Sequence, residues 1–279
     1  MGFEFLQTSE KPLIKLRHKY FKAENIEYQK RTVVMIPGFL DNIDNRIPLV
    51  KAFQKICNVI MYEPRGYGYS VGPRKRRIYK VQYYVDDLAK LIEHYDLKDQ
   101  DYYIWGSCVG SAIAFLYYMD RDGSKPKAII AASPDAKFKT QWWFDVLNVL
   151  PYPFIWVAYK LTMFFLRRIL RKKNPDDVKN VDYSIDRFNK LDLYIQMRIL
   201  VEFIHKYDIR GREVELDLPI LVLSPKKDWF VEPENSKKLA NYHPKSKYIS
   251  LGDAHRLIVD TEEKIVGYAN EFFASIEQL

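Results

Sequence analysis

The chain has 279 residues, of which 48% are hydrophobic and 29% are charged. This length and balance predict one globular domain with a large core, with room for one insertion, and exclude a repeat array or a low-complexity chain. Only two cysteines occur, Cys57 and Cys108, so no disulfide framework is indicated and a reducing, cytoplasmic location is expected. The chain starts without a basic segment and a long apolar run, so no signal peptide is expected.

The net charge of +8 raises the question of an anionic partner, such as nucleic acid or a membrane surface. Much of the excess lies in two clusters, at 74–77 and at 167–173. No zinc-ligand spacing or RNA-binding signature accompanies them, so nucleic acid is not expected as a partner.

Apolar runs alternate with amphipathic stretches along most of the chain. Strands are expected in two runs within 12–36, the second at 32–36, and at 59–62, 102–105, 127–132, 219–224 and 247–251. Helices are expected at about 46–56, 79–95, 112–119 and 233–241, and from about 259 onward. This alternation predicts an α/β fold with a mostly parallel central sheet and helices on both faces.

The alternation stops between residues 136 and 216, where long helical patterns take its place. We therefore expect a core formed by residues 1–135 and 217–279, interrupted by a helical cap insertion at 136–216. The insertion contains a very apolar stretch, 149–166, that approaches the length of a transmembrane helix. A span is rejected, because it would place the last two strands across the membrane from the rest of the sheet.

The sequence Trp105-Gly106-Ser107-Cys108-Val109-Gly110-Ser111 joins a predicted strand to a predicted helix. A strand that turns sharply into a helix, with small residues two before and two after one side chain, is the nucleophile-elbow pattern. Gly106 and Gly110 fit its G-x-S-x-G form, with Cys108 at the position where serine is usual. Neither Ser107 nor Ser111 gives this spacing, so Cys108 is the predicted nucleophile.

Five motifs in chain order resemble those of the α/β-hydrolase superfamily, over nearly the whole chain. They are an oxyanion loop at Pro37-Gly38-Phe39, an R-G-x-G-x-S loop at 65–70, the elbow at 106–111, an acid strand and turn at 219–233, and Leu251-Gly252-Asp253-Ala254-His255. The first motif usually has histidine where Pro37 stands. The set in this order identifies the chain as similar to the α/β-hydrolases, and it implies that fold.

The resemblance implies a catalytic triad of Cys108, Asp228 and His255, in the nucleophile–acid–base order of this fold. Cysteine reacts as the thiolate, which a helix N-terminus and a histidine held by a carboxylate favour. Asp135, after the preceding strand, is the reserve acid, because some family members carry the acid there. The oxyanion hole would use the backbone N–H groups of Phe39 and Val109.

These residues predict an esterase or thioesterase that acts on hydrophobic acyl groups through a covalent acyl-cysteine. Cysteine at the elbow resembles dienelactone hydrolases and polyhydroxyalkanoate synthases, and the synthases pass the acyl group to a hydroxyl. An acyltransferase and a catalytically silent lipid-binding homologue therefore stay open as alternatives. No metal and no organic cofactor are implied.

The cap allows two interpretations: a lid packed only on the core, or a helix that also meets an anionic membrane from the cytoplasmic side. The first is the favoured interpretation, and the basic residues at 167–173 beside the apolar stretch are what make the second plausible. Even the first makes the substrate cleft apolar. The acyl group, its acceptor and the oligomeric state are left open.

Overall fold

The computed structural model describes residues 2–140, 146, 150–173, 192–226, 228, 231–252 and 262–277. Its strands are β1 (Glu4–Glu10), β2 (Leu13–Phe21), β3 (Thr32–Ile36), β4 (Asn58–Tyr62), β5 (Tyr102–Ser107), β6 (Ala128–Ala132), β7 (Ile220–Ser224) and β8 (Lys247–Ser250). The α-helices are α1 (Ile43–Gln54), α2 (Val81–His94), α3 (Val109–Asp120), α5 (Tyr152–Lys173), α7 (Leu193–Ile199), α8 (Pro233–Leu239) and α9 (Glu262–Glu277). Short helical turns are η1 (Ile26–Lys30), η2 (Arg76–Tyr79), η3 (Leu200–Ile204) and η4 (Glu213–Glu215).

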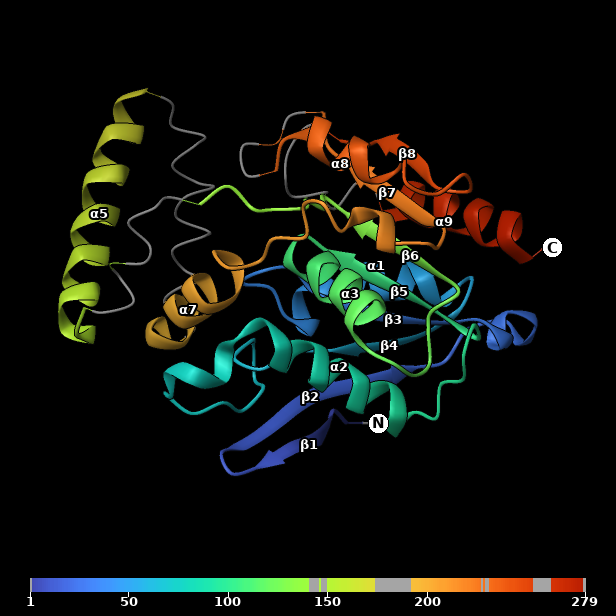
Figure 1. The fold of residues 1–279 in the computed structure, drawn as a ribbon, viewed down its shortest axis with the longest axis horizontal. Helices are drawn as coiled ribbons and strands as arrows, with labels where there is room; N and C mark the ends of the chain where they lie inside the picture. Colours follow the sequence, from blue (N-terminus) through green and yellow to red (C-terminus); the bar gives the residue numbers. More distant parts are fainter. Residues whose placement is uncertain are drawn as a thin grey trace.

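The eight strands form one sheet in the order β1-β2-β4-β3-β5-β6-β7-β8 (Figure 1). The six strands from β4 to β8 in this order run parallel, and β2 pairs antiparallel with both β1 and β4. The prediction of a mostly parallel sheet is therefore confirmed. Strand β1 was not predicted, because most of its side chains are exposed or half-buried at the sheet edge and no clear apolar alternation marks it.

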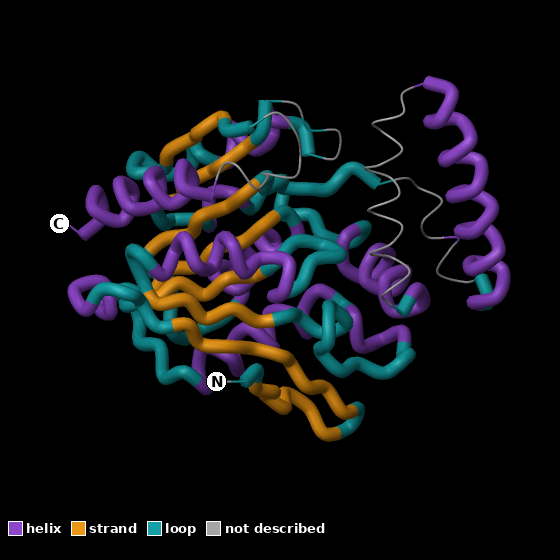
Figure 2. The backbone as a smooth tube through the Cα atoms, turned by 180° about the vertical axis from the view of Figure 1, so that it is seen from behind, coloured by secondary structure: helices purple, strands orange, loops and turns teal. Residues whose placement is uncertain are grey.

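Helices cover both faces of the sheet (Figure 2). Along β3, Val34 packs on the face covered by α2, α3 and α8, and Val33 packs on the face covered by α1 and α9. This alternation follows from the period of two in a strand. The predicted fold class, an α/β-hydrolase fold, is confirmed.

Helix α1 starts earlier than its sequence pattern suggested, at residue 43 instead of about 46. Asn42 caps it, because its side-chain oxygen accepts a hydrogen bond of 2.9 Å from the backbone N–H of Asn45. Pro48 lies inside the helix, past its first turn, so it removes one intrahelical hydrogen-bond donor. The cap therefore fixes where the chain leaves the loop after β3.

Between β6 and β7, the described residues contain helices and no strand. Helix α7 packs on the core, where the Gln196 side chain donates a 2.9 Å hydrogen bond to the carbonyl of Gly66, and η3 places Phe203 against Tyr84 with ring centroids 4.7 Å apart. Helix α5 lies at the outer end of the molecule, beyond α7 (Figures 1 and 2). The division into a core at 1–135 and 217–279 and a cap at 136–216 stays a prediction.

Candidate active site

Cys108 lies at the sharp turn between β5 and α3. Its backbone has φ 50° and ψ −108°, a conformation that costs a non-glycine residue about 1–3 kcal/mol. Hydrogen bonds hold it on both sides: its N–H donates to the carbonyl of Ala132 at 2.7 Å, and its carbonyl accepts from the N–H of Ser111 at 2.9 Å. Cys108 is 5% exposed and directly precedes the first residue of α3. Strain at a nucleophile position is what the elbow pattern leads one to expect.

The two glycines of the elbow stand where no side chain fits. A Cβ atom on Gly106 would lie 2.5 Å from the backbone nitrogen of Ser111, and one on Gly110 would lie 2.4 Å from the carbonyl oxygen of Ile36. The turn therefore closes directly on its own helix and on the end of β3. These close approaches give the physical reason for small residues at both positions.

The loop after β3 lies against the elbow. A Cβ atom on Gly38 would lie 3.2 Å from the carbonyl oxygen of Ser107 and 3.8 Å from the Cβ of Cys108. Phe39 follows directly, and Val109 is the first residue of α3. Within the described chain, the N–H of Val109 donates no hydrogen bond. Both N–H groups proposed for the oxyanion hole thus belong to segments that flank Cys108.

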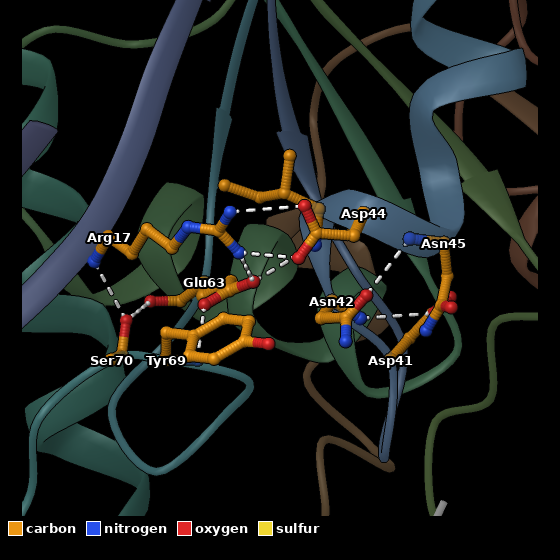
Figure 3. Close-up of polar contacts among 9 residues, drawn as sticks. Arg17, Asp41, Asn42, Asp44, Asn45, Glu63, Tyr69 and Ser70 are labelled. Carbon is orange, nitrogen blue, oxygen red and sulfur yellow. Dashed lines mark hydrogen bonds and ion pairs between the residues drawn. The ribbon is translucent and has the colours of Figure 1, made fainter. Parts of the chain in front are cut away.

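A buried carboxylate fixes the elements around this loop. Glu63, just after β4, accepts hydrogen bonds from the backbone N–H groups of Tyr69 at 2.6 Å and Ile43 at 3.1 Å (Figure 3). Arg17 on β2 donates to Glu63 at 3.1 Å and to both oxygens of Asp44 at 2.7 and 3.0 Å. Burial raises the pKa of Glu63, and these donors oppose that rise. Glu63 therefore joins β2, the start of α1 and the loop at 65–70 behind the site.

The two acids proposed for the triad have different surroundings. Asp228, after β7, is half-buried, and its Oδ1 accepts a hydrogen bond of 2.9 Å from the N–H of Val231. Asp135, after β6, is buried, and it accepts hydrogen bonds of 3.3 Å from the Asn235 side chain on α8 and from the N–H of Lys137. Burial raises the pKa of Asp135, which those hydrogen bonds partly oppose.

His255 lies outside the described residues, so its position relative to Cys108 and to either acid stays a prediction. The serines beside the nucleophile can be placed. Ser111 donates its hydroxyl to the carbonyl of Gly106 at 2.7 Å. Ser107 lines a cavity of about 20 Å³ with Arg46 on α1 and Ser133, which lies toward the α1 and α9 face. The Ser111 hydroxyl is thus used within the elbow, and the Ser107 hydroxyl lies 3.4 Å from the position of a Cβ atom on Gly38.

Two tyrosines in the same core cluster as Cys108 were not predicted from the sequence as site residues. The hydroxyls of Tyr67 and Tyr207 are buried without a hydrogen-bond partner in the part of the chain that the structure describes. Burial raises the pKa of both tyrosines, and a negative charge at Cys108 is among the further causes for each. Tyr67 lay in a variable position of the R-G-x-G-x-S loop, and nothing in the sequence marks Tyr207. Buried hydroxyls without a partner, in the same core cluster as Cys108, are candidates for substrate contacts.

The family model for "Serine aminopeptidase, S33" matches residues 27–262, which is most of the chain. The chain belongs to the serine aminopeptidase, S33, family. It is a member of a hydrolase family and has the α/β-hydrolase fold. No curated protein sequence matches the chain.

Solved structures of similar fold agree with this assignment. A hydrolase from Pseudomonas aeruginosa PA01 superposes with a TM-score of 0.76 at 14% identity, covering 98% of each chain. An esterase from Exiguobacterium antarcticum gives 0.74 at 16% identity, covering 99% of this chain and all of the other. A bromoperoxidase from Bacillus anthracis gives 0.72 at 17% identity, covering all of both chains. At these identities the likeness concerns the fold.

No helix in the described residues is long and apolar enough to cross a membrane. This agrees with the rejection of a membrane span for residues 152–166, the part of the apolar stretch that lies in α5.

Proposed function

We propose that this family member is an esterase or thioesterase that uses Cys108 as its nucleophile. The strained elbow backbone of Cys108, held between Ala132 and Ser111 at the start of α3, is the observation that supports it most directly. A residue is kept in this conformation where the surrounding structure over-determines it, and such positions cluster at active sites.

The proposed reaction has two balanced halves. The Cys108 thiolate attacks the acyl carbon, a C–S bond forms, and the negative oxygen is stabilised by the N–H groups of Phe39 and Val109. Collapse of this intermediate breaks the bond to the leaving alcohol or thiol, which takes a proton from His255. Water then attacks the thioester while His255 accepts its proton. The C–S bond breaks, which yields the acid and restores the thiolate, with Asp228 orienting His255 throughout.

The side chains around Cys108 favour a substrate that has a hydrophobic acyl group and a polar end. The Phe39 ring lies edge-on to Tyr67, with centroids 6.5 Å apart, so the loop beside the elbow presents aromatic surface. The hydroxyls of Tyr67 and Tyr207 supply hydrogen-bonding groups that the described protein leaves unpaired. An ester or thioester with an apolar acyl chain fits this combination.

The test is a substrate series with a trap for the intermediate. Aryl esters and acyl thioesters of increasing acyl length should be hydrolysed, and rapid acid quench should give a mass increase on the peptide that contains Cys108. The Cys57→Ala variant should behave like the parent, because Cys57 is fully buried and burial raises the pKa of its thiol. An acyl adduct on a serine in place of Cys108 would contradict the proposal.

The same experiment separates the two alternatives. With an added alcohol, an acyltransferase would form the new ester in preference to the free acid, as the resemblance to polyhydroxyalkanoate synthases suggests. A silent lipid-binding homologue would turn over no substrate, and Cys108 would react slowly with iodoacetamide near neutral pH. Fast alkylation of Cys108 without turnover would show that the thiol is reactive and that the substrate belongs to a different class.

We further propose that α5 brings the enzyme to an anionic lipid surface. The inward residue Ile155 is 4% exposed, whereas Phe154, Leu161 and Phe164 on another face are 65%, 53% and 60% exposed. Residues 154, 157, 161, 164 and 165 recur at helical spacing, so they form one outward apolar stripe. Soluble proteins seldom leave a stripe of this kind uncovered.

The charges of α5 favour a lipid surface, and not a second protein, as the partner that covers the outward apolar stripe. The helix contains six basic residues and no acidic one, with five of the basic residues at 167–173. An apolar aromatic face with lysine and arginine beside it is typical of helices that lie in a membrane interface. Each basic residue near an anionic surface adds about 1 kcal/mol to binding, less at high salt.

Co-sedimentation with vesicles tests this at low and high salt. Vesicles of phosphatidylcholine with phosphatidylserine should bind the protein more at low salt, and changing Leu161 and Phe164 to serine should abolish binding. Ile26→Ser is the matched control, because Ile26 is 84% exposed on the distant η1 turn. Self-association of the free protein, lost in the α5 variant and unaffected by vesicles, would show that a second copy covers the stripe instead.

A further inference from the structure

Three potential metal ligands meet at the edge of the sheet far from the elbow. Glu4 on β1 and His18 on β2 are direct partners in the antiparallel pair, so their side chains project from the same face. His94, the last residue of α2, completes the group. One ligand atom from each residue lies within 4.8 Å of the other two. The strand β2 is three strands from β5, or about 14 Å across the sheet, so this group is separate from Cys108.

A hydrogen bond fixes the orientation of the His18 ring. Its Nδ1 lies 2.6 Å from the hydroxyl of Tyr95, which leaves Nε2 for another partner. Metal-binding histidines commonly use their second ring nitrogen in such a hydrogen bond, which fixes ring orientation and tautomer. Its ring also stands edge-on to that of His94, with centroids 5.3 Å apart.

His18 is the buried member of this group, with 1% of its surface exposed. Glu4 and His94 are exposed, so an ion can reach the group from solvent and both side chains can adjust.

We propose that Glu4, His18 and His94 bind one divalent transition-metal ion, zinc in particular. Two imidazoles and a carboxylate are a donor set that zinc accepts, with water in the fourth position. With bonds of about 2.0–2.1 Å, tetrahedral ligand atoms lie about 3.4 Å apart, so the group must contract by rotation of its exposed members. The ion would join β1 to β2 and to the end of α2.

No motif could have revealed this site, because its ligands come from three elements. Residues 4, 18 and 94 have no short spacing in the sequence, and only the antiparallel pairing of β1 with β2 brings the first two together. The sequence implies no metal for the hydrolytic reaction, and this site leaves that expectation unchanged. Its expected role is to hold the edge strand β1 in place.

The test measures zinc binding directly, in protein without a histidine tag. Because a cysteine and a histidine at the active site could bind zinc as well, the parent for the series is Cys108→Ala. Competition against a chromophoric chelator should give one zinc per chain. Glu4→Gln and His94→Gln should each weaken that binding about 100-fold or more, since even second-sphere changes cost 10–100-fold. The control His243→Gln, near α8, should leave the affinity unchanged.

Cobalt provides an independent readout on the same proteins. One bound Co²⁺ should give the intense visible absorption of a four-coordinate ion, and this band should disappear in Glu4→Gln and His94→Gln. Both positions are exposed, so these variants should keep the unfolding temperature of the metal-free parent. The proposal is overturned if the Cys108→Ala parent binds no zinc at micromolar concentration, or if its affinity is the same in both variants.

Discussion

Helices α3 and α5 are both apolar in sequence but meet opposite surroundings. All nine residues of α3 from Val109 to Tyr117 are buried, because the helix lies against β5 and its neighbours in the core. Helix α5 lies at the outer end of the molecule (Figure 1), and Phe154, Leu161 and Phe164 on it are more than half exposed. Dense packing around α3 can hold the strained backbone of Cys108 in place. The exposed side chains of α5 are not packed in this way, so they are available to another surface.

The largest expected effect concerns the strained end of α3. Changing Cys108 to alanine should lower kcat/KM by at least about 10⁴-fold, because loss of a nucleophile removes the covalent path. Steady-state kinetics on the best aryl ester or thioester measures this. Cys57→Ala is the matched control, since this thiol is buried at α1 and its Sγ lies 3.4 Å from the carbonyl of Phe53. Equal losses in both variants would mean that folding, and not chemistry, is being measured.

The next effect concerns the two carboxylates that follow β7 and β6. Asp228→Asn should lower kcat/KM by about 10²–10⁴-fold, because histidine would lose the group that orients it. Asp135→Asn should change it less than about tenfold, since an amide oxygen can still accept the hydrogen bond from Asn235. If Asp135→Asn proves the more damaging of the two at equal thermal stability, the acid is Asp135.

A third effect tests how tightly the start of α3 is packed. Gly110→Ala should lower the free energy of unfolding by about 1–3 kcal/mol, because the new methyl group meets the carbonyl of Ile36. Gly267→Ala on α9 should raise it by about 0.5–1 kcal/mol, since nothing lies within 4 Å and alanine favours a helix. Urea unfolding of both variants measures the difference. A neutral Gly110→Ala would mean that the elbow has room to relax.

The sequence predicted the parts of the fold in which the apolar residues of the pattern are also the buried ones. Parallel strands such as β3, β5 and β7 are buried runs, and the elbow has a fixed spacing of small residues. It missed β1, an edge strand with little burial, and it missed Tyr67 and Tyr207, which only the three-dimensional packing brings near Cys108. The apolar composition of residues 149–166 also did not predict which face of helix α5 is exposed.

The smallest expected effect concerns the free energy of unfolding when exposed residues of α5 are changed. Leu161→Gln and Phe164→Gln should each change the free energy of unfolding by no more than about 0.5 kcal/mol, because exposed side chains lose little packing. Ile155→Ala, on the inward face of the same helix, should lower it by about 2–5 kcal/mol. Thermal or urea unfolding in the absence of lipid measures all three. If the outward variants destabilise the protein as much as Ile155→Ala, the stripe packs against the protein in solution. In that case its apolar side chains belong to the core, and α5 offers no free surface to a membrane.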